Sequence, residues 1–155
     1  MVEATPAYFF DASVAVKVYG EEEGSDRAEE ILDRRAEVYL SRVGVVEVAA
    51  SFFRKTKPGQ MEVEDALSAV EDLRVDVNGV YQIVEVSPVA ADWAIEVAKR
   101  HGLRAHDCLQ LATALLLREQ RDALGLAPLT FASSDRELGA AARAEGLAVE
   151  DPASS

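Results

Sequence analysis

The sequence has 155 residues, 49% hydrophobic and 28% charged, as expected for one soluble globular domain. Its 28 acidic residues outnumber 16 basic ones, and the formal net charge of -12 argues against a protein that holds nucleic acid through a broad basic surface. Cys108 is the only cysteine, which excludes an internal disulfide, and the sequence shows neither a signal peptide nor a membrane-spanning apolar run, so we expect a cytoplasmic protein with no membrane partner.

The first half of the chain alternates short apolar runs with helical patterns. Residues 7–10 read as a buried strand, 13–19 as a short helix, 25–36 as a longer one, and 38–40 as a second strand. Two further helices are predicted over residues 43–55 and 62–73.

The second half continues the alternation. Residues 81–86 predict a strand, and Ser87 followed by Pro88 predicts the start of a helix that ends near His101. Residues 107–120 predict a leucine-rich helix and 129–132 a strand. Ser134 and Glu137 have the spacing of a capping box before a helix that ends near Gly146. A last short strand is expected at 147–149, and residues 151–155 are expected to form a tail outside a single domain of residues 1–150.

Short apolar strands separated by helices predict an α/β fold with a mostly parallel sheet covered on both faces. In such sheets, binding sites form beyond the carboxyl ends of the strands. This rule directs attention to Asp11, Ser41 and residues 133–135, which directly follow predicted strands.

Four acidic residues are the candidates for a functional site. Glu47 lies in an apolar helix, where an ionised carboxylate needs a cation, either Arg42 or Arg54 or a metal. Asp11, Asp107 and Asp135 can each be explained singly as helix caps or helix-start charges. Together they can face one edge of a parallel sheet, and a carboxylate cluster persists mainly by binding cations.

The residues around these acids resemble a known family. Residues 9–13, 46–49, 105–112 and 130–138 look like the four motif blocks of PIN domains, in the same order and spacing, and most closely those of the VapC-type toxins of bacterial toxin–antitoxin pairs. The resemblance implies a PIN-like three-layer α/β/α sandwich with a mostly parallel sheet of four to five strands. The family's acidic residues fall on Asp11, Glu47, Asp107 and Asp135, and its small hydroxyl residues on Ser13 and Ser133.

The resemblance also implies a function. It indicates an endoribonuclease that depends on Mg²⁺ or Mn²⁺ held by the four acids, and a VapB-like antitoxin that inhibits it. A homodimer is expected through apolar helix faces that include Val63, Leu67 and Val70. Basic residues near the motif blocks are candidate RNA contacts: Lys17, Arg104 and Arg136, with Arg54, Lys55 and Lys57 nearby.

Other interpretations remain at this stage. A binding or regulatory protein on the same fold, with little or no catalytic activity, is compatible with the acidic charge. A structural α/β module would use the four acids only as caps and ion pairs. An aspartyl-phosphate phosphatase is disfavoured, because the second acid usually expected two residues after Asp11 is replaced by Ser13. For His106, a polar residue at a helix start is favoured over a metal ligand, and Cys108 is expected to be a small buried residue.

Overall fold

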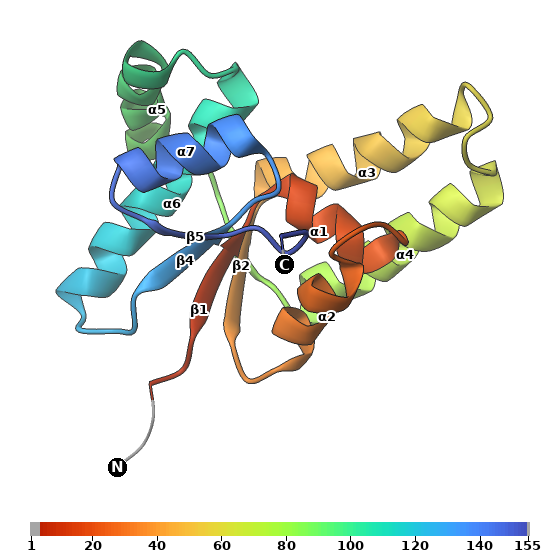
Figure 1. The fold of residues 1–155 in the computed structure, drawn as a ribbon, viewed down its shortest axis with the longest axis horizontal. Coiled ribbons are helices and arrows are strands. Elements are labelled where there is room, and N and C mark those ends of the chain that lie inside the picture. Colours follow the sequence, from red (N-terminus) through yellow and green to blue (C-terminus); the bar gives the residue numbers. More distant parts are fainter. Residues whose placement is uncertain (1–3, 155) are drawn as a thin grey trace.

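Five short strands form one parallel sheet at the centre of the protein (Figure 1). The computed structural model describes residues 4–154. The strands are β1 (Ala7–Phe10), β2 (Glu37–Ser41), β3 (Gln82–Val84), β4 (Leu129–Ala132) and β5 (Ala148–Glu150), in the order β3-β2-β1-β4-β5. Every neighbouring pair is parallel, which confirms the predicted α/β fold with four to five mostly parallel strands.

Seven helices in the described part of the chain cover the two faces of this sheet, which confirms the three-layer sandwich (Figure 1). On one side lie α1 (Ala12–Tyr19), α2 (Ser25–Asp33), α3 (Arg42–Thr56) and α4 (Val63–Gly79). On the other lie α5 (Pro88–His101), α6 (Ala105–Ala123) and α7 (Arg136–Ala144). Helices α3 and α4 pair as a hairpin that reaches past the edge of the sheet.

The side chains of β1 alternate between these two layers. Phe9 stacks on Phe131 of β4, with 5.7 Å between ring centroids, in the core beneath α5, α6 and α7. Phe10 points to the opposite side and packs with Val14, Val48 and other residues of α1–α4. Each buried phenylalanine contributes about 1.5–3 kcal/mol to folding. Because both faces are covered, the strands are mostly apolar, and β1 is apolar along its whole length.

The strand register brings three chain segments to one edge of the sheet. Phe10 of β1 pairs with Leu40 of β2 and with Ala132 of β4. Ser41 is the last residue of β2, and Asp11 and Ser133 directly follow β1 and β4. The three residues therefore lie side by side at the carboxyl ends of these strands. This is the edge that the sequence predicted for a site.

Several predicted boundaries were wrong. The helix expected over 62–73 continues to Gly79, because the apolar face that includes Leu73 extends to Val77. The strand expected over 81–86 is limited to Gln82–Val84, which are the residues that pair with β2. None of the helices in residues 4–154 has the length and hydrophobicity needed to cross a bilayer.

The expected tail at residues 151–155 is instead folded against the domain as far as it is described. Pro152 is buried, and the Asp151 carboxylate accepts hydrogen bonds from the Ser134 hydroxyl at 2.6 Å and from the Ala153 amide at 2.9 Å. Gly24, at a φ of 91°, lies so close that a Cβ there would be 2.8 Å from the Ala153 nitrogen. Ser155 lies outside the described residues.

Candidate metal and nucleic-acid site

Asp11 lies at the centre of the site, directly after the central strand β1. Its side chain is 4% exposed and accepts two hydrogen bonds on Oδ2, from the Ser13 hydroxyl at 2.6 Å and from the Ser133 hydroxyl at 3.1 Å. Burial raises the pKa of the Asp11 carboxyl, and the two serine hydrogen bonds oppose that rise. Asp11 therefore has a fixed orientation but is costly to ionise unless a positive charge is close by.

The loop after β4 is attached to Asp11 by the same two serines. The Ser134 amide donates to Ser13 Oγ at 3.0 Å, and the Asp135 amide donates to Ser133 Oγ at 3.1 Å. The Asp135 carboxylate accepts the Leu138 amide at 3.1 Å and is the N-cap of α7. The sequence had assigned this cap to Ser134, which was wrong because the Ser134 hydroxyl is bonded to Asp151 instead.

Glu47 reaches the site from α3, and a buried amide orients it. Gln110 of α6 donates to Glu47 Oε1 at 3.1 Å and accepts the Ser41 hydroxyl at 2.7 Å. Burial and the charge of Asp11 raise the pKa of Glu47, against the lowering effect of His106. The alternative that an arginine neutralises Glu47 is not realised among the described residues, since Arg42 pairs with Glu85 and Arg54 has no ion-pair partner.

Asp107 lies in the first turn of α6, and charge repulsion couples it to each of Asp11, Glu47 and Asp135. Burial raises its pKa, the neighbouring His106 lowers it, and the charges of Asp11 and Asp135 raise it further. Asp11 likewise acts on Glu47. The four predicted acids are thus brought to the same edge of the sheet, near enough to repel one another.

The donor chemistry of these acids fits a hard divalent cation, because Mg²⁺ prefers carboxylate oxygens and keeps several waters. A preformed cage is absent from residues 4–154, where no group of three His, Cys, Asp or Glu side chains stands at metal-binding spacing. Burial raises the pKa values of Asp11, Glu47 and Asp107 despite the opposing effect of His106 on the last two, so a bound cation would favour their ionised forms. Asp11, Glu47, Asp107 and Asp135 are the residues that would hold the ion.

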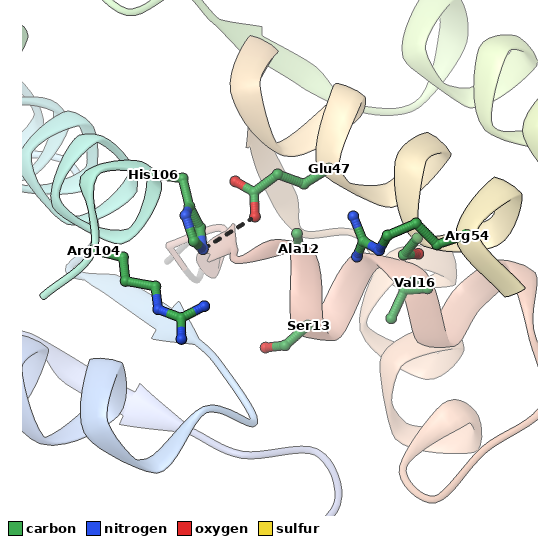
Figure 2. A pocket seen from close by; sticks show the side chains of 8 residues that line it. Ala12, Ser13, Val16, Glu47, Arg54, Arg104 and His106 are labelled. Carbon is green, nitrogen blue, oxygen red and sulfur yellow. Dashed lines mark ion pairs between the residues drawn. The ribbon is translucent and has the colours of Figure 1, made fainter.

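Two cavities open beside the acids. The first, of about 700 Å³, is lined by residues of α1, α3 and the start of α6 (Figure 2): Ala12, Ser13, Val16, Glu47, Ser51, Arg54, Arg104 and His106. The second, of about 370 Å³, contains acidic residues in its wall: Gly102, Leu103, Arg104, His106, Asp107, Asp135 and Glu137. Arg104 and His106 line both cavities and so stand between them.

The three basic residues predicted to contact RNA are placed differently. Arg104 lines both cavities, whereas Arg136 is exposed at the start of α7 and lines neither. Lys17 is only 5% exposed, and its ammonium donates to the Glu22 carboxylate and the Glu23 carbonyl, both at 2.9 Å. Lys17 was therefore a wrong prediction, since its charge holds the turn after α1 and is not available to a ligand.

Sequence reasoning missed two residues of the site. Gln110 is fully buried and orients Glu47; a polar residue three positions after Asp107 within an apolar helix was its signal. His106 was interpreted as a helix-start residue, yet its Nε2 lies 3.9 Å from Glu47 Oε2 (Figure 2). The same nitrogen is 3.4 Å from Asp107 Oδ1. Its position beside both acids follows from the packing of α3 against α6.

Comparison with known proteins identifies the family. The family model described as PIN domain matches residues 8–144, and the chain belongs to this family. Ribonuclease VapC45 and Ribonuclease VapC49 of Mycobacterium tuberculosis are each 30% identical to it over 144 residues, covering 93% of this chain and 94% of theirs. The chain is thus a VapC-like PIN domain protein.

Solved structures show the same fold. FitAcB from Neisseria gonorrhoeae superposes with a TM-score of 0.65 at 21% identity, covering 96% of this chain and 99% of that one. A toxin-antitoxin complex from Klebsiella pneumoniae gives a TM-score of 0.63 at 17% identity, covering 94% and 98%. At this level of identity the likeness concerns the fold alone.

Proposed function

We propose that this protein is an endoribonuclease that depends on Mg²⁺ or Mn²⁺ and acts in the cytoplasm as the toxin of a toxin–antitoxin pair. The observation that carries the proposal is the group of four acids at one edge of the sheet, three of them with raised pKa values and none neutralised by arginine among the described residues. The relationship to proteins named ribonucleases over nearly the whole chain supports it.

The residues of the site would have distinct roles. Ser13 and Ser133 fix Asp11, and Gln110 fixes Glu47, so that neither carboxylate rotates freely, and Glu47 lines the first cavity. Asp107 and Asp135 complete the acidic set from α6 and from the cap of α7. When bound, a divalent cation supplies positive charge that stabilises the attacking and leaving oxygens of a phosphodiester. Arg104, between the two cavities, would contact the RNA backbone.

The net negative charge of the chain is consistent with RNA binding through a few arginines and a bound cation. With a net charge of -12, the protein cannot hold RNA by a broad basic surface, so binding would depend on a few arginines and on the cation. A VapB-like antitoxin is the proposed partner, supported by similarity to the toxin-antitoxin complex from Klebsiella pneumoniae.

A homodimer is also proposed, through the exposed face of α4 that carries Val63 and Leu67, at 58% and 55% exposure. Val70, which the sequence had included in that face, is only 9% exposed and belongs to the core between α3 and α4.

The direct test is cleavage of a mixed RNA pool by the purified protein with Mg²⁺, with Mn²⁺ and with a chelator, beside the Glu47→Gln and Asp107→Asn variants. The proposal expects cleavage only by the wild type and only with a divalent cation. RNA left equally intact by wild type and variants would favour the alternative, a binding or regulatory protein on the PIN fold.

A further inference from the structure

The first cavity contains a second positive group, Arg54, that has no partner in the described part of the chain. Arg54 lies on the same helix as Glu47, two turns further along, and is exposed. Five other arginines form ion pairs with acids: Arg27, Arg34, Arg42, Arg100 and Arg121. In a chain with 28 acidic residues against 16 basic ones, Arg54 and Arg104 are left without such a partner beside the same cavity.

The two guanidinium groups approach the cavity from opposite sides. Figure 2 shows Arg54 reaching in from α3 and Arg104 from the start of α6, with Ser13 and Glu47 between them. Arg54 is seven positions after Glu47 along α3, a rise of about 10 Å. A ligand that touches both arginines would therefore extend past Glu47, and a strand with successive phosphates offers a negative group to each arginine.

The wall of the second cavity is more acidic than that of the first. It contains Asp107, Asp135 and Glu137, with Arg104 and His106 on the boundary. Asp107 and Asp135 would be matched by the proposed cation, but Glu137 lies outside that set and repels phosphate groups. A phosphate chain that leaves the acidic site is therefore held better in the first cavity, beside Arg54, than in the second.

From this asymmetry we propose that Arg54 binds a backbone phosphate of the RNA strand on one side of the cleaved bond, while Arg104 binds a phosphate next to that bond. The inference rests on the proposed ribonuclease function and adds the path that the RNA strand takes across the site. The strand is anchored on the side of α3, and the part in the second cavity is held weakly. Arg54 is a substrate-positioning residue and takes no part in the chemistry.

The test compares Arg54→Gln with Arg35→Gln. Arg35 is a matched control, because it is also exposed and without an ion-pair partner in residues 4–154, but lies before β2, at the opposite edge of the sheet. Steady-state cleavage of a single-stranded RNA oligomer is measured with Mn²⁺. Arg54→Gln is expected to raise KM about tenfold with kcat within about twofold, whereas Arg35→Gln leaves both unchanged. Thermal unfolding verifies that each variant is folded.

Binding gives a second readout that does not depend on cleavage. In the Glu47→Gln background, RNA affinity is measured by fluorescence anisotropy over a range of salt concentrations. Loss of one phosphate contact reduces the slope of log affinity against log salt by about 0.7 for a single strand. Arg54→Gln is expected to show this reduction and Arg35→Gln is not.

The outcomes separate the two proposals. If the wild type cuts RNA but Arg54→Gln matches Arg35→Gln in KM and in salt slope, the Arg54 inference is overturned and the ribonuclease proposal stands. If no protein cuts RNA but Arg54→Gln alone lowers the salt slope, the phosphate contact holds and the ribonuclease proposal fails. A fall in kcat with unchanged KM would also overturn the inference, because it would place Arg54 in the chemistry.

Discussion

The hydroxyl of Ser134 donates a 2.6 Å hydrogen bond to the carboxylate of Asp151 and so ties the loop after β4 to the chain that follows β5. The amide of the same serine is bonded to Ser13, which in turn donates to Asp11. Asp151 therefore supports the site through Ser134, although it was expected to lie in a tail.

Replacing Asp151 by alanine removes the acceptor for both Ser134 and the Ala153 amide. We expect the free energy of unfolding to fall by about 2 kcal/mol, as for the loss of hydrogen bonds to a charged group. RNA cleavage should slow several-fold as the Ser133–Asp135 loop loosens. Denaturant unfolding and cleavage assays measure the two effects. The Asp151→Asn variant keeps one acceptor oxygen and should recover most of both; no recovery would mean that the charge itself matters.

The raised pKa values of Asp11, Glu47 and Asp107 determine how stability depends on pH. Acids whose pKa is raised by folding bind protons more tightly in the folded state than in the unfolded state. Their contribution therefore favours folding at low pH and is lost as the pH rises above the ordinary values of 3.8 for aspartate and 4.5 for glutamate. With a chelator present, Asp11→Asn should be more stable than the wild type at pH 7, and the difference should shrink towards pH 4.

With divalent cations present, the wild type should instead be more stable than Asp11→Asn. Mn²⁺ or Mg²⁺ is expected to stabilise the folded wild type by RT ln(1 + [L]/Kd) and so to raise its melting temperature as the metal concentration increases. The gain should be much smaller in Asp11→Asn and Asp107→Asn. Thermal unfolding over a metal titration provides the measurement. An equal gain in all three proteins would place the bound ion elsewhere on this acidic chain.

Gly44 makes room for the amide that orients Glu47. A Cβ at this position would stand 3.0 Å from Leu40 Cδ1 and 3.1 Å from Gln110 Nε2. Gly44→Ala should therefore displace Gln110, reduce RNA cleavage about tenfold and fail to give the stability that alanine normally adds to a helix. Gly139→Ala is the control, since its Cβ would meet only Val149 Cγ1 at 3.6 Å. That variant should gain about 0.5–1 kcal/mol and keep full activity.

Lys17 should prove to be a structural residue. Replacement by alanine leaves the Glu23 carbonyl and the Glu22 carboxylate without their donor at the turn after α1. We expect a loss of about 2 kcal/mol in the free energy of unfolding. Below the melting temperature, the KM for RNA should stay unchanged. A raised KM with unchanged stability would instead restore Lys17 as a substrate contact.

The edge of the sheet that holds the site could be predicted from the sequence because of two simple rules. Short apolar runs separated by helices imply parallel strands, and residues that follow such strands share one edge. Asp11 and Asp135 follow two of these strands closely. The prediction that Asp11 and Asp135 lie at the same edge of the sheet did not require knowledge of how any helix packs.

Features that depend on helix packing or on single side-chain contacts could not be predicted in this way. The Gln110–Glu47 bond joins α6 to α3, 63 positions apart in sequence. Lys17 follows Asp11 closely and therefore seemed to belong to the site, but the chain turns at Gly20 and brings Glu22 to its ammonium. Similarly, Val63, Leu67 and Val70 share one helical spacing, and only the packing of α3 on α4 decides that Val70 is buried.

The strand order has a consequence for synthesis on the ribosome. Because β4 pairs with β1 across more than a hundred residues of intervening chain, one edge of β1 stays open until residues 129–132 emerge, near the end of the 155-residue chain. Asp11 and Glu47 are made early, but Ser133 and Asp135 arrive only with β4 and α7. A nascent chain therefore holds an incomplete acidic group, and under the proposed function RNA cleavage would begin only once translation of the domain is nearly finished.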